Sequence, residues 1–226
     1  MIVFDCDGVL VDSEAVAVAT ELRVLADHGV RFDRDTYVRT FTGLAPHDWH
    51  QGLADEFRHR TGQAPPHDLF DLLDATVERA VDERATAIPG AHAAVDAVDG
   101  PRCVASSTPR PSLLRRLRHT GLAELFGSAV FSADQVDRGK PAPDLFLFAA
   151  TSMGVEPADC VVVEDSVHGV RAGRAAGMAV IGFTGGGHCP DGYADVLTAA
   201  GAHTVIGDFA ALTAAVEGLR PQQVHR

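Results

Sequence analysis

The sequence predicts an α/β fold in which a parallel sheet is flanked by helices and carries an all-helical insertion. Short apolar runs alternate with helical patterns after Pro89 and Gly90, as expected for right-handed βαβ units. Between Asp33 and Ala87, by contrast, there are helical patterns but no strand pattern. The 226 residues suit one domain with such an insertion, or a large and a small domain.

The first strand is predicted at Ile2 to Asp5, where a β-branched apolar run stops at a carboxylate. A helix is predicted from Ser13 to His28, because apolar residues recur there at helical spacing, with Ser13 as N-cap and Gly29 as C′. Further helices are predicted around Asp35 to Phe41, His47 to His59 and Leu69 to Arg84.

The later strands are predicted from short apolar runs at Cys103 to Ala105, Ala129 to Phe131, Cys160 to Val163, Ala179 to Gly182, and Thr204 to Ile206. In an open parallel sheet, ligands bind at the carboxyl ends of the strands, near the point where the strand order reverses. Three predicted strands end there in polar residues, which are Asp5, Ser106, and Glu164 with Asp165. These residues are candidates for a functional site.

The composition argues against several classes of function. The formal net charge of −12 repels polyanions, and no basic stripe could follow a nucleic-acid backbone. No apolar run approaches the roughly 18 residues of a membrane span, and the start lacks the features of a signal peptide. We therefore expect a cytoplasmic protein, a monomer or weak homo-oligomer, that binds neither nucleic acid nor membrane. The four widely spaced cysteines predict neither a disulfide framework nor a zinc site.

Three short motifs each have both a functional and an ordinary structural interpretation. Asp5 and Asp7 lie two residues apart where the first strand ends, but such a pair is also common in turns. Ser106 and Ser107 begin a hydroxyl cluster that could hold phosphate oxygens or simply cap a helix. Lys140 follows a glycine and precedes two prolines. Without the other motifs, this loop would be interpreted as an ordinary exposed turn.

The fourth motif is the pair Glu164 and Asp165 at the end of another predicted strand. Acidic groups without a positive partner are costly to crowd together, so the convergence of carboxylates suggests a divalent cation. Oxygen ligands favour magnesium over zinc. The sequence therefore predicts Mg²⁺ as a cofactor.

Taken in order, the motifs resemble those of the haloacid dehalogenase superfamily. They are Asp-x-Asp-Gly-Val, the Ser106 cluster, Lys140-Pro-x-Pro-Asp and Glu164-Asp165-Ser-x-x-Gly. In its details the chain looks like the subgroup of β-phosphoglucomutase-like enzymes and sugar-phosphate phosphatases. The resemblance implies an α/β fold with a Rossmann-like parallel-sheet core and an inserted all-helical cap. Residues 1–12 and 89–226 would form the core, and residues 13–88 the cap.

The same resemblance implies roles for the acidic residues. Asp5 would be the nucleophile that takes the phosphoryl group, and Asp7 the acid that protonates the leaving oxygen and then activates water. Mg²⁺ would be held by Asp5, the backbone carbonyl of Asp7, and Asp165, with Glu164 as a ligand or close beside them.

It also implies how the substrate is held. Ser106 and Lys140 would bind the phosphoryl oxygens, helped by backbone N–H groups near Gly8 and Ser107. The segment from Thr42 to Pro46, with Gly43, corresponds to the loop that often meets the substrate in this family. Arg110 follows the serine cluster, so it could reach a substrate oxygen or lie exposed at a helix start.

The predicted function is therefore Mg²⁺-dependent hydrolysis of a small phosphorylated metabolite, such as a sugar phosphate, through an aspartyl-phosphate. Two alternatives stay open: a β-phosphoglucomutase-type phosphomutase and a non-catalytic phosphometabolite-binding protein. Mutases of this family carry a His in the first cap helix and an Arg in the cap loop. The matching positions here are Ala17 and Pro46, which favours the phosphatase, although Arg39 or Arg79 could substitute.

Overall fold

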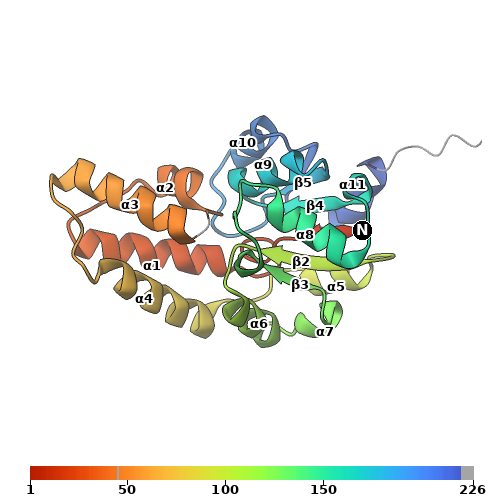
Figure 1. Ribbon diagram of the computed structural model, residues 1–226, viewed down its shortest axis with the longest axis horizontal. Coiled ribbons are helices and arrows are strands. Elements are labelled where there is room, and N and C mark those ends of the chain that lie inside the picture. Colours follow the sequence, from red (N-terminus) through yellow and green to blue (C-terminus); the bar gives the residue numbers. More distant parts are fainter. Residues whose placement is uncertain (45, 220–226) are drawn as a thin grey trace, which may run out of the picture.

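A parallel six-stranded sheet forms the core of the protein, in the order β3-β2-β1-β4-β5-β6. The computed structural model describes residues 1–44 and 46–219. In Figure 1 the sheet lies to the right of a bundle of helices, α1 to α4. The strands are β1 (Ile2–Phe4), β2 (Arg102–Ser106), β3 (Val130–Ser132), β4 (Val161–Glu164), β5 (Ala179–Phe183) and β6 (Thr204–Ile206).

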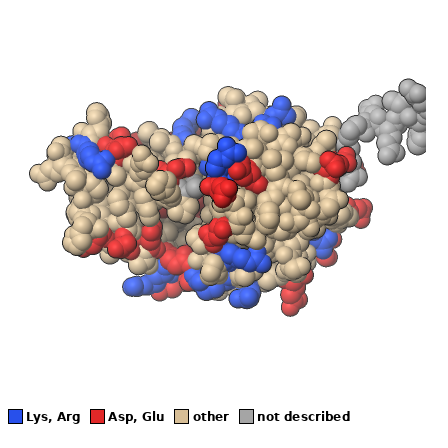
Figure 2. Space-filling model, viewed as in Figure 1, with Lys and Arg blue, Asp and Glu red and all other residues tan. Residues whose placement is uncertain are grey.

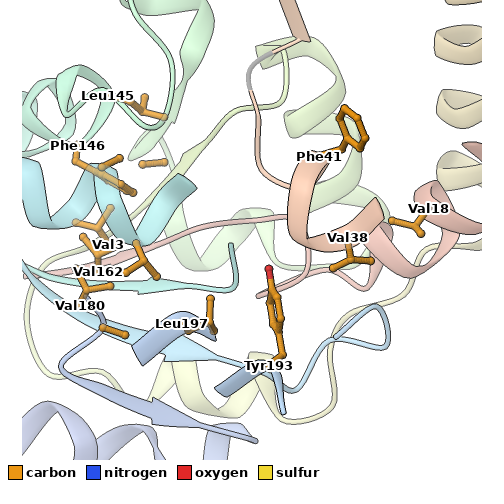
Figure 3. Packing of buried hydrophobic residues seen from close by; sticks show 14 of the residues in the cluster. Val3, Val18, Val38, Phe41, Leu145, Phe146, Val162, Val180, Tyr193 and Leu197 are labelled. Atoms are coloured by element: carbon orange, nitrogen blue, oxygen red, sulfur yellow. The ribbon is translucent and has the colours of Figure 1, made fainter. Parts of the chain in front are cut away.

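Helices cover both faces of this sheet. One face packs against α5 (Ala91–Asp96), α6 (Arg110–His119), α7 (Ala123–Phe126) and α11 (Leu212–Leu219). The other packs against α8 (Asp144–Met153), α9 (Val167–Ala175) and α10 (Tyr193–Ala200). Figure 3 shows side chains of the second layer, where Val3, Val162 and Val180 of adjacent strands face apolar residues of the helices. Both faces are buried, which is why the strands are mostly apolar.

The strand order reverses beside β1. The chain runs outward from β1 to β2 and β3, then returns to place β4 on the other side of β1. Phe4 is in register with Val104 of β2 and with Val163 of β4. The residues that follow these strands therefore meet at one edge of the sheet, at the point where open α/β sheets bind ligands.

The helical region consists of α1 (Ser13–Asp27), α2 (Arg34–Phe41), α3 (Pro46–Thr61) and α4 (Leu69–Arg84). Helix α1 packs along α4 (Figure 1). The interior of the helical region is built from buried apolar side chains of all four helices, among them Leu25, Tyr37, Leu53 and Leu73.

Two chain segments join this region to the core, and they pair with each other. Val11 and Ala87 form an antiparallel bridge. The N–H of Ile88 donates to the carbonyl of Leu10 over 2.9 Å, and that of Asp12 donates to the carbonyl of Thr86 over 2.8 Å. The helical region thus leaves and re-enters the core at one place.

The fold class is as predicted, and each predicted strand and helix is present with end shifts of a residue or two. One local expectation is wrong. Ser13 is not the N-cap of α1 but its first helical residue, after Asp12. Its hydroxyl bonds to Asp7 instead. Gly29 does follow the helix with a positive φ, and all four cysteines are free, as expected. Among the described residues, no helix is long and apolar enough to cross a membrane.

Candidate active site

Lys140 links two of the predicted acidic residues. Its Nζ donates to Oδ1 of Asp5 over 2.6 Å and to Oε1 of Glu164 over 2.6 Å. It also donates to the carbonyl of Ala105 over 3.1 Å. Burial alone would lower the pKa of Lys140, but Asp5 and Glu164 raise it above its usual value. A fully charged lysine therefore lies at the switch point of the sheet.

Asp5 itself follows β1 and is almost completely buried. Burial raises the pKa of its carboxyl well above the usual value, and the nearby Glu164, Asp165 and Asp7 raise it further, while Lys140 lowers it. An ionised nucleophile at this place therefore needs more positive charge than Lys140 alone supplies.

Asp7 has a different set of partners. Its carboxylate accepts hydrogen bonds from the hydroxyls of Ser13 at 2.5 Å, Thr108 at 2.7 Å and Ser106 at 3.2 Å. It also forms an ion pair with Arg116 at 2.5 Å. Burial by itself would raise the pKa of Asp7, but Arg116 and the hydroxyl donors outweigh it, so the pKa is lowered. In this arrangement Asp7 is ionised and ready to accept a proton.

Asp165 is buried and only partly satisfied. Nε2 of His188 lies 2.9 Å from its Oδ2, yet the geometry is not that of a hydrogen bond, and Oδ2 has no donor among the described residues. Burial and then Glu164 raise the pKa of Asp165 well above its usual value. Gly8 approaches so closely, with φ +80°, that a Cβ there would lie 1.9 Å from Oδ2.

These observations fit a hard divalent cation. Among the described residues, no three His, Cys, Asp or Glu side chains are already arranged around a metal position. The carboxylates of Glu164 and Asp7 are occupied by Lys140 and Arg116. The unsatisfied Oδ2 of Asp165 and the buried carboxylate of Asp5 are oxygen donors of the kind that Mg²⁺ prefers. A cation held by them would also supply the positive charge that Asp5 lacks.

The predicted phosphate-binding residues line one small cavity. Its volume is about 130 Å³, and Asp5, Asp7, Ser106, Ser107 and Lys140 are among the residues around it. Glu164 and Asp165 line it too. The structure thus brings together the residues for which the sequence predicts catalytic and metal-binding roles, although they come from four separate segments.

The loop after α2 covers this cavity. Gly43 lines it, and its carbonyl lies 3.5 Å from the hydroxyl of Ser107, which donates to it. Gly43 has φ +80°, and a Cβ there would lie 2.3 Å from Oγ of Ser166. Only glycine allows the loop to pass this close to the core. The neighbouring Ala45 lies outside the described residues.

One candidate residue is placed elsewhere. The guanidinium of Arg110 bonds to the carbonyl of Val130 and to Oε1 of Gln135, beside β3. Arg110 is not among the residues lining the cavity that holds Asp5. In the structure the side chain bonds to a backbone carbonyl of β3, and a contact between Arg110 and substrate stays a prediction.

Three contacts of the site were missed in the sequence: Arg116 and Ser13 on Asp7, and His188 against Asp165. The spacing of apolar residues in α6 could have indicated that Arg116 lies near the core. Leu113 and Leu117 are buried, and Arg116 lies three residues after the first of them, close to the buried face.

A family comparison agrees with this geometry. Residues 1–177 match the family model described as a haloacid dehalogenase-like hydrolase. The chain belongs to this family. The match includes the segments that carry Asp5, Ser106, Lys140 and Asp165.

Individual relatives agree as well. The chain is 30% identical to 6-phosphogluconate phosphatase of Escherichia coli, over 82% of each chain. It is 32% identical to fructose-1-phosphate phosphatase of the same organism, over 80% of this chain and 94% of that one. These matches confirm the predicted family and enzyme class, a phosphoric monoester hydrolase.

A solved structure supports the fold independently. The crystal structure of a haloacid dehalogenase-like protein of unknown function from Agrobacterium tumefaciens superimposes with a TM-score of 0.87. It is 37% identical in sequence and covers 96% of this chain and 97% of its own.

Proposed function

We propose that this protein is a Mg²⁺-dependent phosphatase that hydrolyses a small phosphorylated sugar or related metabolite through an aspartyl-phosphate on Asp5. One observation carries the proposal. A nucleophilic carboxylate, a second carboxylate two residues later, a hydroxyl and a lysine share one small cavity; they are Asp5, Asp7, Ser106 and Lys140. This set provides for attack, proton transfer and charge neutralisation at one phosphoryl group.

In the first half of the reaction, a carboxylate oxygen of Asp5 attacks phosphorus and the bond from phosphorus to the alcohol oxygen breaks. Asp7, when protonated, gives its proton to that oxygen, and the alcohol leaves. Lys140 and Ser106 contact the phosphoryl oxygens and hold them in line. Asp7 must first take up a proton, since its present ion pair with Arg116 favours the charged form.

In the second half, water attacks the phosphorus of the aspartyl-phosphate. The carboxylate of Asp7 takes a proton from this water, the bond from phosphorus to Asp5 breaks, and inorganic phosphate leaves. Asp5 is returned as a carboxylate. The present ionised state of Asp7 allows it to accept this proton, although the donors that lower its pKa also make it a weaker base.

Asp5, Asp165 and the backbone carbonyl of Asp7 would hold Mg²⁺, with Glu164 beside them fixing Lys140. When bound, the ion supplies positive charge that offsets the crowded carboxylates and the phosphoryl oxygens. Gly8 gives Asp165 the room it needs.

We further propose that residues 13–88 act as a movable cap. The paired connections at Val11 and Ala87 form a narrow link on which the helical region could rotate. The contact of Gly43 with Ser107 holds the loop over the site. Closure would exclude water while Asp5 reacts with the ester, and opening would release the alcohol.

Cavity lining favours hydrolysis over the mutase reaction. Ala17 and Pro46 both line the larger cavity beside the site, and neither can bind a second phosphate. Arg39 and Arg79 are not among the described residues that line either this cavity or the small one. A bisphosphate would therefore meet little compensation for its distal charge.

The test is phosphate release from a panel of sugar phosphates, polyol phosphates and phosphorylated sugar acids, with Mg²⁺ or with EDTA. We expect Mg²⁺-dependent release from at least one of them. No release from any ester, including p-nitrophenyl phosphate, would contradict the proposed function. Rapid conversion of β-glucose 1-phosphate to glucose 6-phosphate, with a trace of bisphosphate and little free phosphate, would favour the mutase.

A further inference from the structure

A second, larger cavity opens from the phosphate site. Its volume is about 510 Å³, and it lies between the helical region and the core. It shares Glu14, Gly43, Leu44 and Thr108 with the small cavity that holds Asp5. An ester bound with its phosphoryl group at Asp5 would therefore extend its alcohol part into this space.

The charge around this larger cavity is strongly one-sided. Four carboxyl side chains line it: Glu14, Glu21, Asp74 and Glu78. Among its described lining residues, Arg116 is the single Lys or Arg. In Figure 2, acidic side chains lie along the boundary between the helical region and the core, with basic side chains beside several of them.

Arg116 is already paired on both sides. Its Nη1 contacts Asp7 at 2.5 Å, and its Nη2 contacts Glu78 at 3.2 Å. An anionic group on the substrate would have to displace one of these carboxylates and then lie near the others. The cavity is therefore unfavourable for a carboxylate or a second phosphate.

Two buried hydroxyls in the cavity have no partner. Tyr37 is 1% exposed and Thr42 is 6% exposed, and neither hydroxyl makes a hydrogen bond among the described residues. Both residues line the cavity. The Tyr37 hydroxyl is near enough to Glu21 and Trp49 to influence the pKa of Tyr37, though no hydrogen bond of good geometry joins them. Buried hydroxyls without a protein partner are available to bond to a bound ligand or to water.

The surroundings of Glu21 suit a cation in particular. Asp74 is close enough to raise the pKa of Glu21, after the larger effect of burial. Trp49 also lines this part of the cavity, and the face of an indole ring attracts a positive charge. An ammonium group here would relieve the repulsion between the two carboxylates and donate hydrogen bonds to them.

We propose that the alcohol released by this enzyme carries a protonated amine, which lies in the larger cavity against Glu21 and Asp74. Its hydroxyls bond to Tyr37 and Thr42. The substrates are then amino-sugar or amino-polyol phosphates rather than phosphorylated sugar acids such as 6-phosphogluconate. This proposal rests on the proposed function, since it assumes that the phosphoryl group lies at Asp5.

The test compares four esters of similar size: glucosamine 6-phosphate, N-acetylglucosamine 6-phosphate, glucose 6-phosphate and 6-phosphogluconate. We expect kcat/KM for the amine to exceed that of either neutral ester about tenfold, as a partly buried ion pair would give. The sugar acid should be the poorest substrate. Glu21→Gln should reduce the preference for the amine, and Asp74→Asn should do so to a smaller extent, because Asp74 is exposed and already pairs with His50.

Matched controls are available on the outer surface of α4. Glu83→Gln and Asp71→Asn remove the same charges at exposed positions that do not line the cavity, and both should leave the order of substrates unchanged. A preference for 6-phosphogluconate, or equal use of the amine and its N-acetyl form, would overturn the proposal while leaving the phosphatase intact.

Binding separates the two proposals further. Calorimetric titration of the Asp5→Asn protein with the same esters measures the order of affinities without turnover. Tightest binding of glucosamine 6-phosphate would support the amine site even if no phosphate is released by the parent protein. Tightest binding of 6-phosphogluconate would overturn it in either case.

Discussion

The guanidinium of Arg116 contacts the carboxylate of Asp7 at 2.5 Å, although the two residues are 109 positions apart in the chain. Because Arg116 helps to hold the pKa of Asp7 below its usual value, the stability contributed by the pair is present at neutral pH. That contribution is lost as the pH falls through the lowered pKa.

Replacement of Arg116 by Gln should therefore lower the free energy of unfolding at pH 7 by about 3 kcal/mol, since it leaves a buried charge without its partner. The difference should shrink below about pH 4, where Asp7 is protonated in the unfolded chain. Urea unfolding across this pH range measures it. Arg115→Gln is the matched control, and its exposed pairs should contribute less than about 1 kcal/mol. Equal losses for both variants would contradict the assignment.

Asp5→Asn should abolish phosphate release, by a factor on the order of 10⁴ or more, because an amide is a poor nucleophile. The fold should persist, since Lys140 keeps its contact with Glu164. Phosphate release and far-UV circular dichroism check the two expectations. Asp191→Asn, at an exposed position, serves as the control. Near-normal turnover by the Asp5 variant would rule out the covalent route.

Asp165→Asn should weaken Mg²⁺ binding by about 100-fold or more, since the loss of a group that only supports a metal ligand already costs roughly 10- to 100-fold. The concentration of Mg²⁺ that gives half-maximal activity should rise accordingly. A second measurement does not depend on activity: Mg²⁺ should raise the melting temperature of the parent protein, and less so that of the variant. No stabilisation of the parent by Mg²⁺ would count against the site.

Burial raises the pKa of Glu21 from 4.5 to about 7. Between these values the folded protein holds a proton that the unfolded chain has lost, so the free energy of unfolding should fall as the pH rises. Glu21→Gln cannot ionise and should be more stable than the parent at pH 8, by about 1 kcal/mol because the side chain is partly exposed. Thermal melts should show this gain disappearing below pH 4.5. A gain of equal size at pH 4 would show that ionisation is not its source.

Gly43→Ala should push the loop away from Ser166, because the added Cβ would lie 2.3 Å from its hydroxyl oxygen and φ is +80°. We expect kcat/KM to fall about tenfold or more, through loss of positioning over the site. The global stability should change far less than activity. Gly62→Ala, also at positive φ but with nothing within 4 Å, is the control for backbone strain alone. Equal activity losses in both variants would refute the close approach.

Much of the core could be predicted because its strands are buried on both faces. Runs such as Val161 to Val163 had to be apolar, and the carboxylates that follow them had to lie at the edge of the sheet. The predicted site residues come together for this reason. Once the order of the parallel strands is known, it determines which of the site residues are neighbours at the edge of the sheet.

The partners of Asp7 could not be predicted in the same way. Arg115 and Arg116 are adjacent, and the apolar spacing of α6 indicates which of them lies near the core but not that its partner is Asp7. Ser13 was expected to cap α1, since hydroxyls at helix starts usually do so. In the structure its hydroxyl instead donates a hydrogen bond to the buried carboxylate of Asp7. The position of Arg110 could not be predicted either, because its guanidinium bonds to the backbone carbonyl of Val130.

The bridge between Val11 and Ala87 brings the two backbone connections of the helical region together at one place. Residues 13–88 could be exchanged for those of a relative without altering any strand of the sheet or the segments that carry Asp5, Lys140 and Asp165. Substrate choice and phosphoryl chemistry can then evolve separately, one by replacing the module and the other by preserving the edge of the sheet. We expect a chimaera joined at these two positions to keep the proposed reaction and to acquire a new repertoire of alcohols.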